Sequence, residues 1–494
     1  MAVVWLAAHH AMWRDEVRAL TLALSGDNVL AMLRNMHGDG HPALWYLLLR
    51  AGHAIVATPL VLPVMAGLIG TAAAILFLTC APLGGRWLAL ILFGRFFLYE
   101  YTVMARNYGV SMLALFCMAA LWQRGYRGIG QGLLLLLLTN SNVHSVILAG
   151  AFLLFWMLEV WESDGLRWTP QWRAWLTSAA IAAIGVLLCV IAIFPPIDDA
   201  GTAQSGPTFG AVIHALLLPA WQLRPLFPLE LLWRLPGPVW QIGGSLLLFG
   251  GLLAFARRPN ILAAAAAAML LLSLMFALVY PASYRHAGLL LVFLVTMLWL
   301  DRSSLPAPAR SDRFASLAAR AQPIGSALLA VLFAIQLIGT VQQLANTLRD
   351  RPESRSADLA SWVHQHPEFA RSWIIADPDY LIEPIPYYLS NPVWRLREQQ
   401  PGSVVIFTRH ARLSLTLDEI LATARELRAR SGKPVLILMT TRLDQVASAQ
   451  INEGFNWVLN VQPDAKNRFL KTTTRVARFA PVSVDETYDV YALP

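Results

Sequence analysis

Two adjacent carboxylates, Asp15 and Glu16, follow an apolar stretch of residues 1–13. Charged side chains held against a bilayer cost free energy, so such residues usually have a function. In one interpretation, Asp15 is a general base that takes the proton of an attacking hydroxyl, and Glu16 supports it or contacts the acceptor. The alternative is a helix start at which Asp15 pairs with Arg18 one turn later. The amphipathic segment 17–36 is expected to lie along the membrane surface, which favours the first interpretation.

Arginines at the ends of two other apolar runs suit phosphate binding. Glu100 and Arg106 lie on a short turn, followed by Tyr108, and Arg285 begins a later run. A guanidinium is a planar, permanently charged fork that matches phosphate oxygens. Arg106 and Arg285 are therefore expected to bind phosphate and to stabilise charge on a leaving group, with Glu100 orienting an acceptor or sugar hydroxyl. The alternative is a local salt bridge between Glu100 and Arg106.

Histidines occur beside the same runs. His37 and His41 are four residues apart, but two glycines between them argue against a helix, so the spacing predicts no metal site. His144 stands beside two asparagines at the mouth of a helix, where it is either a polar cap or a substrate contact. His286 follows Arg285 and shares its expected position.

Composition favours a membrane protein over a nucleic-acid-binding one. Hydrophobic residues make up 57% of the 494, and charged residues only 14%. The net charge of +8 comes from arginines scattered between apolar runs, which is typical of membrane topology and phosphate contacts and gives no reason to expect nucleic acid as a partner. The three cysteines lie inside apolar runs, which predicts neither disulfides nor a zinc site. The first run lacks the basic start and cleavage pattern of a signal peptide.

The apolar runs predict about eleven spanning helices. Arginine-bearing loops alternate on one side, which is therefore expected to be cytoplasmic, and Asp15, Glu100 and Arg285 fall on the other. This holds if residues 42–58 lie on the outer surface, with the N-terminus inside and the C-terminus outside. The run 1–13 is short for a crossing, so it is expected to begin at the membrane midplane or to follow a late start. The expected spans are 1–13, 61–81, 86–99, 106–122, 131–143, 144–161, 174–195, 238–256, 261–281, 285–300 and 323–345.

The composition changes near Leu348, where charge becomes frequent. We expect a transmembrane domain over residues 1–347 and an extracytoplasmic α/β domain over residues 348–494. The second domain is expected to guide the acceptor or a partner and not to carry the chemistry. Residues 416–430 have helical spacing, with Gly432 as a stop. The predicted buried strands are Ser372–Ala376, Val404–Phe407, Val435–Met439 and Trp457–Val461.

These features together resemble the polytopic GT-C glycosyltransferases, the superfamily of protein O-mannosyltransferases and bacterial aminoarabinose transferases. The resemblance covers the architecture of residues 1–345. Many relatives carry an acidic residue two positions before the arginine, whereas Glu100 precedes Arg106 by six. The matching elements are Arg14-Asp15-Glu16, the segment Gly40-His41-Pro42-Ala43-Leu44-Trp45-Tyr46-Leu47, Ala105-Arg106-Asn107-Tyr108, the helix mouth at His144, Tyr284-Arg285 and the C-terminal domain.

The resemblance implies an inverting transfer of a sugar from a polyprenyl-phosphate donor to an acceptor hydroxyl on a lipid, glycan or protein. It places the reaction on the outer face of a bacterial inner membrane, with no nucleotide, metal or other cofactor. The implied catalytic residues are Asp15 and Glu16. The implied substrate-binding residues are His41, Glu100, Arg106, Tyr108, His144, Arg285 and His286.

Two other classes of function stay open. A transporter would carry ionisable residues near the midplane and show repeat symmetry, whereas the charges here gather at one face. A cell-envelope assembly subunit would have its function in the C-terminal domain, and Asp15 would then be dispensable. Sugar transfer that depends on both a donor and Asp15 separates these classes.

Overall fold

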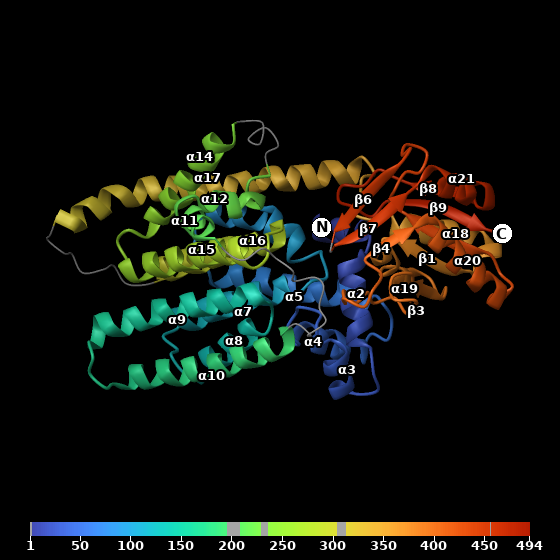
Figure 1. Cartoon of the computed structure of the whole chain (residues 1–494). Coiled ribbons are helices and arrows are strands. Elements are labelled where there is room, and N and C mark those ends of the chain that lie inside the picture. Colours follow the sequence, from blue (N-terminus) through green and yellow to red (C-terminus); the bar gives the residue numbers. More distant parts are fainter. Residues whose placement is uncertain (1, 195–207, 229–235, 304–312, 455) are drawn as a thin grey trace.

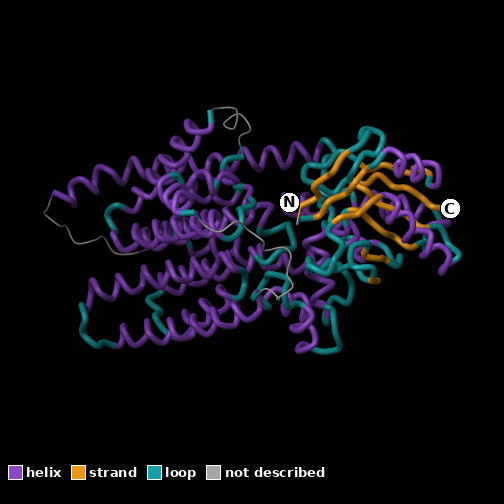
Figure 2. The backbone as a smooth tube through the Cα atoms, in the orientation of Figure 1, coloured by secondary structure: helices purple, strands orange, loops and turns teal. Residues whose placement is uncertain are grey.

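The computed structural model describes residues 2–194, 208–228, 236–303, 313–454 and 456–494. Its helices form an elongated bundle, and every described strand lies in a C-terminal part at one end of that bundle (Figure 1). Figure 2 shows this separation of helices and strands, with the N-terminus where the two parts meet. The prediction of a polytopic helical membrane protein with a C-terminal α/β unit is confirmed.

Seven described helices are long and apolar enough to cross a membrane. Two shorter apolar helices, α7 (Tyr108–Gln123) and α8 (Ile129–Thr139), lie among them, and α6 (Gly85–Leu92) is followed by the π-helix η1 (Phe96–Glu100). The expected count of about eleven crossings stays a prediction. The seven are α5 (Val61–Cys80), α9 (Val143–Asp164), α10 (Pro170–Ile193), α14 (Gly237–Leu252) with the 3-10 turn η3 (Leu253–Phe255), α15 (Pro259–Leu278), α16 (Tyr284–Ser303) and α17 (Arg313–Leu348).

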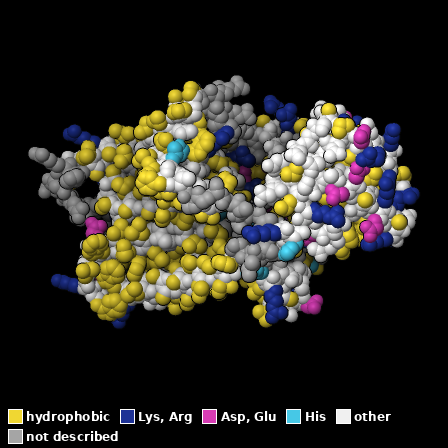
Figure 3. Space-filling model, viewed as in Figure 1, with side chains coloured by type: hydrophobic (Ala, Val, Ile, Leu, Met, Phe, Trp, Pro, Cys, Tyr) yellow, Lys and Arg dark blue, Asp and Glu magenta, His cyan; other side chains and the backbone are white. Residues whose placement is uncertain are grey.

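Burial divides these helices into a centre and a periphery. In α16, each residue from Ala287 to Leu300 is buried, so this helix runs through the middle of the bundle. In α10, Leu187 and Ile191 are each 59% exposed. Apolar surface of this kind is unfavourable in water and favourable in lipid. Figure 3 shows that hydrophobic side chains cover the visible face of the bundle, while charged ones are frequent on the C-terminal part.

Short helices fill the face of the bundle next to the C-terminal part. The expected span over residues 1–13 is wrong, because α1 (Ala2–Ala8) has only seven residues and a crossing needs about 20. The expected inside position of the N-terminus loses its basis with this span. The predicted surface segment 17–36 is broken by a turn between α2 (Arg14–Ala23) and α3 (Val29–Asn35). Of the remaining short helices, α4 (Leu44–His53) packs on α2, α11 (Phe209–Leu217) and α12 (Pro219–Gln222) pack on α15, and η2 (Arg224–Leu226) packs on α16.

The C-terminal part contains two sheets. In the larger one, the order is β3-β2-β1-β5-β9-β8, and β1 (Trp373–Asp377) pairs in parallel with both β2 (Val393–Arg395) and β5 (Val435–Met439). The smaller one has the order β4-β7-β6. The remaining elements are α18 (Ser356–Gln365), η4 (Pro367–Phe369), η5 (Asp379–Ile382), α19 (Ile385–Tyr388), β3 (Gln400–Pro401), β4 (Ser414–Thr416), α20 (Leu417–Ser431), β6 (Ala449–Gly454), β7 (Trp457–Val461), α21 (Pro463–Thr472), β8 (Thr474–Phe479) and β9 (Tyr488–Leu493).

Three of the four predicted strands are confirmed, as β1, β5 and β7, and so is the helix α20, which ends at Gly432 in the left-handed conformation. The predicted strand Val404–Phe407 is wrong, because this segment is a loop. Two of its backbone N–H groups donate to side chains. The Val405 N–H donates to Glu383, and Ile406 N–H donates to Glu398.

Candidate active site

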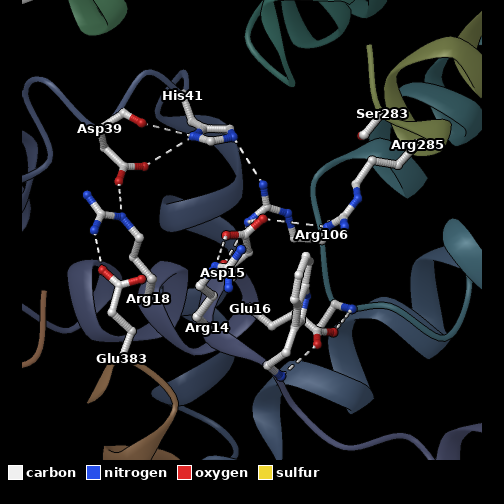
Figure 4. A network of polar contacts seen from close by, with 12 residues as sticks. Arg14, Asp15, Glu16, Arg18, Asp39, His41, Arg106, Ser283, Arg285 and Glu383 are labelled. Atoms are coloured by element: carbon white, nitrogen blue, oxygen red, sulfur yellow. Dashed lines mark hydrogen bonds and ion pairs between the residues drawn. The ribbon is translucent and has the colours of Figure 1, made fainter. Parts of the chain in front are cut away.

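Asp15 lies between two guanidiniums at the end of the membrane bundle (Figure 4). Its Oδ2 is 3.5 Å from Nη1 of Arg106 and 3.6 Å from Nη1 of Arg285. Arg106 also donates to the backbone oxygen of Asp15 at 2.7 Å, which ties the arginine to the start of α2. The Asp15 side chain keeps 34% of its surface exposed, so the carboxylate can meet a substrate.

The same arginines keep Asp15 ionised. Burial would raise the pKa of Asp15, but Arg106, Arg285 and Arg14 outweigh that effect and lower it to about 2. The carboxylate is therefore deprotonated at neutral pH. Its proton affinity depends on these arginines, so any anion that neutralises them makes Asp15 a stronger base.

The local backbone explains how Arg106 reaches this position. The turn after η1 packs directly on the first turn of α7, because a Cβ at Gly109 would lie 2.6 Å from the Tyr101 carbonyl oxygen. Tyr108 stacks on Tyr101 with ring centroids 5.8 Å apart. Glycine at this turn and two stacked rings thus hold the guanidinium beside Asp15.

Arg285 begins the central helix α16 and packs over an aromatic ring. Its guanidinium carbon lies 4.4 Å from the centre of the Trp13 ring, and its backbone oxygen accepts a hydrogen bond from Tyr101 at 2.6 Å. Its Nη1 is buried and has no hydrogen-bond partner among the described residues. Buried donors are nearly always satisfied, so this nitrogen is well suited to a further acceptor such as a phosphate oxygen.

His41 is held in one tautomer by its two neighbours. Arg106 can only donate, so the 3.2 Å contact from its Nη2 requires an unprotonated Nε2 on His41. The proton of a neutral ring is then on Nδ1, which lies 3.2 Å from the Asp39 carboxylate. Although burial opposes it, Arg18 lowers the pKa of Asp39, with His41 and Tyr46 adding to the effect. The predicted loop around His41 thus contains an unpredicted partner, Asp39.

Glu16 points away from Asp15 into a buried cluster. One carboxylate oxygen accepts from His10 Nε2 at 2.8 Å, and the other accepts from the Ala105 N–H at 2.6 Å. The Nδ1 of His10 lies 2.8 Å from the Tyr99 hydroxyl, which in turn donates to Glu353 at 2.7 Å. Burial opposes the charge on His10, yet the two glutamates raise its pKa to about 10. Glu16 therefore anchors the start of α2 to η1 and to the C-terminal part.

Glu100 forms its ion pair with neither of the arginines beside Asp15. Its buried carboxylate is 2.9 Å from Nη2 of Arg95, and no Glu100–Arg106 pair occurs among the described contacts. Arg95 also lies over the ring of Tyr284, the residue before Arg285. The local salt bridge considered for Glu100 is therefore formed with an arginine five residues earlier.

The two predicted histidines, His144 and His286, stack on each other with ring centroids 4.5 Å apart. The Nδ1 of His286 accepts from the Ser283 N–H at 3.1 Å. The same ring lies beside that of Tyr108, with ring centroids 5.7 Å apart. Both ring nitrogens of buried His144 lack a hydrogen-bond partner within the described part of the chain. The His144–His286 stack thus joins the mouth of α9 to the residues around Arg106.

Several residues of the site were missed because their partners are distant in the sequence. Asp39 had a signal, since it lies inside the motif that contains His37 and His41. Glu353 and Glu383 had none, because only the fold brings the C-terminal part to α2. Among the described residues, no group of three or more histidine, cysteine or acidic side chains is arranged to hold a metal.

Comparisons with known proteins find structural similarity only. No protein-family model and no curated protein sequence matches this chain. It is similar to ArnT from Cupriavidus metallidurans in the apo state, with 15% identity and a TM-score of 0.47, and bound to undecaprenyl phosphate, with 13% and 0.46. Both alignments cover 100% of this chain and 96% of the other. At these scores the similarity carries no argument about activity, which must come from the site.

Proposed function

We propose that this chain is a membrane glycosyltransferase that moves a sugar from a polyprenyl-phosphate donor to an acceptor hydroxyl with inversion. Asp15 is the general base, and Arg106 and Arg285 bind the donor phosphate. The observation that carries this proposal is one partly exposed carboxylate between two guanidiniums, 3.5 and 3.6 Å away, at the end of a membrane bundle.

The charge balance around Asp15 favours an anionic ligand. Two guanidiniums and one carboxylate leave one positive charge unmatched among these three side chains. Arg285 also keeps a buried nitrogen without a partner among the described residues. A phosphate would neutralise the charge and accept from that nitrogen, and Arg is suited to bind it in bidentate geometry.

The place of the site favours a lipid carrier. Arg285 lies in the first turn of the apolar helix α16, with Asp15 beside it, so a donor with its chain in the bilayer would present its phosphate at this height. A soluble nucleotide donor would gain nothing from a bundle with so much exposed apolar surface. This supports a polyprenyl-phosphate sugar as the donor class.

The proposed step is a single displacement. The acceptor oxygen forms a bond to the anomeric carbon while the bond from that carbon to the phosphate oxygen breaks, and the sugar inverts. The acceptor proton passes to Asp15, and the lipid phosphate leaves with the bonding electron pair. Arg106 and Arg285 stabilise the charge on the leaving phosphate. The bound phosphate also partly neutralises the charge of both arginines. This raises the pKa of Asp15 and makes it a stronger base.

The other predicted site residues have supporting places in this proposal. Glu16 fixes the start of α2, and His41 and Tyr108 hold Arg106. His144 and His286 are proposed to line the sugar side of the site. Glu100 is proposed to support substrate binding indirectly, through its ion pair with Arg95.

We also propose an orientation and a division of labour. The loop between α9 and α10, with Arg167, lies at the end of the bundle away from the C-terminal part (Figure 1). Arginine-rich loops favour the cytoplasm, so the Asp15 face and residues 348–494 would lie outside the bacterial cytoplasmic membrane. The C-terminal domain would then stand over the site and guide a lipid, glycan or protein acceptor.

The test uses purified full-length protein in nanodiscs. Polyprenyl-phosphate sugars are offered as donors together with lipid, glycan and peptide acceptors, and the product anomer is determined by NMR. We expect transfer with inverted configuration and release of polyprenyl phosphate. Absence of transfer from every polyprenyl-phosphate donor, or retained configuration, contradicts the proposal. Mass spectrometry of copurifying lipids identifies the first donor to use.

A further inference from the structure

A chain of polar contacts connects the C-terminal domain to the arginine beside Asp15. Glu383, between η5 and α19, bonds to Arg18 of α2, which lies 365 residues earlier in the sequence. Arg18 in turn donates from Nε to Asp39 at 2.6 Å. Asp39 contacts His41, and His41 accepts from Arg106, as described above. Figure 4 shows the whole series from Glu383 to Asp15.

The part of this series from Glu383 to Asp39 is shielded from water, whereas the His41 side chain is 30% exposed. The side chains of Asp39 and Glu383 are 5% and 4% exposed, and that of Arg18 is 17% exposed. Surface ion pairs contribute little, but removal of one partner from a buried pair leaves an uncompensated charge and is strongly destabilising. We therefore expect loss of the Glu383 charge to alter the interactions of Asp39, because solvent screens these buried groups only weakly.

The geometry of Arg18 explains why its two partners act together. Its Nη1 bonds to Glu383 and to the Val405 oxygen, while its Nε bonds to Asp39. With Glu383 in place, the guanidinium reaches Asp39 from one side only. This leaves the second Asp39 oxygen for Tyr46 and His41. Loss of the Glu383 charge is expected to change how Arg18 bonds to Asp39 and, through Asp39, how His41 is held.

We propose that Glu383 is a positioning residue for the transfer reaction. Through Arg18 and Asp39 it sets the tautomer and direction of His41, and His41 holds Arg106 in the place where it meets Asp15 and the donor phosphate. The C-terminal domain thus has a second role besides guiding the acceptor: its docking orders the active site. The link to catalysis rests on the proposed function, whereas the coupling of Glu383 to the loop around His41 does not.

The first experiment measures this coupling without any substrate. Hydrogen exchange is followed by mass spectrometry in the full-length protein, for wild type, Glu383→Gln and Asp489→Asn. Glutamine retains an oxygen for the Val405 N–H and loses only the charge that pairs with Arg18. Asp489 is a matched control, because it is 4% exposed and pairs with Arg478 inside the C-terminal domain.

We expect faster exchange of the Asp39 amide in Glu383→Gln, by about tenfold or more, since a lost charge-assisted hydrogen bond has an effect of this size. That amide bonds to the Met36 oxygen and reports on the loop. Asp489→Asn is expected to leave it unchanged. Equal exchange in Glu383→Gln and wild type overturns the coupling, and this holds even if the protein has no transferase activity.

The second experiment measures the effect on turnover. We expect Glu383→Gln to lower kcat about tenfold, Glu383→Asp to restore part of it, and Asp489→Asn to match wild type. In a His41→Gln background, Glu383→Gln should have little further effect, because both changes act through one contact series. An equal loss in both backgrounds overturns the positioning role. A wild-type protein that transfers no sugar contradicts the proposed function instead, and hydrogen exchange still decides on the coupling.

Discussion

The carboxylate of Asp15 lies 3.6 Å from Nη1 of Arg285, close enough for an ion pair, yet this nitrogen makes no hydrogen bond within the described structure. The arginine therefore stabilises the negative charge of Asp15 while one of its own donors stays available. A base and an anion site that share a guanidinium are suited to a reaction in which a proton is taken as a phosphate leaves.

Arg285→Ala is expected to weaken donor binding. Loss of a charge-assisted contact costs about 1.5–3 kcal/mol, which corresponds to roughly a 10- to 150-fold higher Kd for polyprenyl phosphate. Lysine should restore only part of the affinity, because a point charge does not replace a fork. Binding to the protein in nanodiscs, measured by tryptophan fluorescence, checks this.

The matched control for Arg285 is Arg127→Ala. Arg127 also packs over a tryptophan ring, that of Trp122, but it belongs to the loop between α7 and α8. Its removal should leave donor affinity unchanged. Equal affinities of Arg285→Ala and wild type would count against the phosphate site.

The pH dependence of the reaction should differ between free enzyme and donor complex. Asp15 must be deprotonated, so activity is present above its pKa and lost as pH falls through it. In the free enzyme this pKa is lowered to about 2, so kcat/KM should keep its plateau through mildly acidic pH. A bound phosphate raises the pKa, and the acid limb of kcat should lie at higher pH. Coincident acid limbs for kcat and kcat/KM would contradict this account of Asp15.

His10 should make stability depend on pH. Its pKa is raised from 6.5 to about 10 in the folded protein by Glu16 and Glu353, against the effect of burial. The stabilisation is therefore fully present below pH 6.5 and lost as pH rises towards 10. The difference in Tm between wild type and His10→Gln should shrink over this range, as measured by thermal unfolding in detergent. His9→Gln, an exposed neighbour, is the control, and a gap that does not change with pH refutes the charged state of His10.

Topology reporters should distinguish the two faces. A reporter that is active only in the cytoplasm should be silent when fused after Pro494 and active when inserted at residues 165–169, between α9 and α10. The reason is the arginine content of the second position. The reverse pattern would move Asp15 to the cytoplasmic face and leave no place for an outer-face reaction.

Residue types predicted the chemistry of the site better than its connections. Asp15, Arg106 and Arg285 were recognisable as charged groups at the ends of apolar runs, and the structure brings them together. The partners of Arg18 were not predictable, because Glu383 lies 365 residues later in the sequence and only the fold brings it to Arg18. Glu16 and Glu100 look like equal candidates in the sequence, but their carboxylates are taken by His10 and Arg95.

The errors in secondary structure have similar physical causes. Residues 404–407 have the apolar, β-branched composition of a strand, yet the polar backbone groups of Val405 bond to Glu383 and Arg18. Hydrogen bonds to side chains distant in the sequence thus take the place of the strand-to-strand hydrogen bonds that composition alone predicts. Residues 1–13 are apolar, but the helix within them ends at Ala8. The side chain of the next residue, His9, bonds to the Trp5 backbone oxygen. Only the seven-residue helix remains, and it packs against η1.

The most direct test of the central claim is the turnover rate of Asp15→Asn with a polyprenyl-phosphate sugar that the wild-type protein accepts. Asparagine keeps the size of the side chain and removes the proton acceptor, and Asp27→Asn, in the exposed turn after α2, is the control. We predict that Asp15→Asn lowers kcat by roughly 10²–10⁴-fold while the protein stays folded and binds polyprenyl phosphate, and that Asp27→Asn matches wild type. Sugar transfer by folded Asp15→Asn at a rate near that of wild type would contradict the assignment of Asp15 as the base.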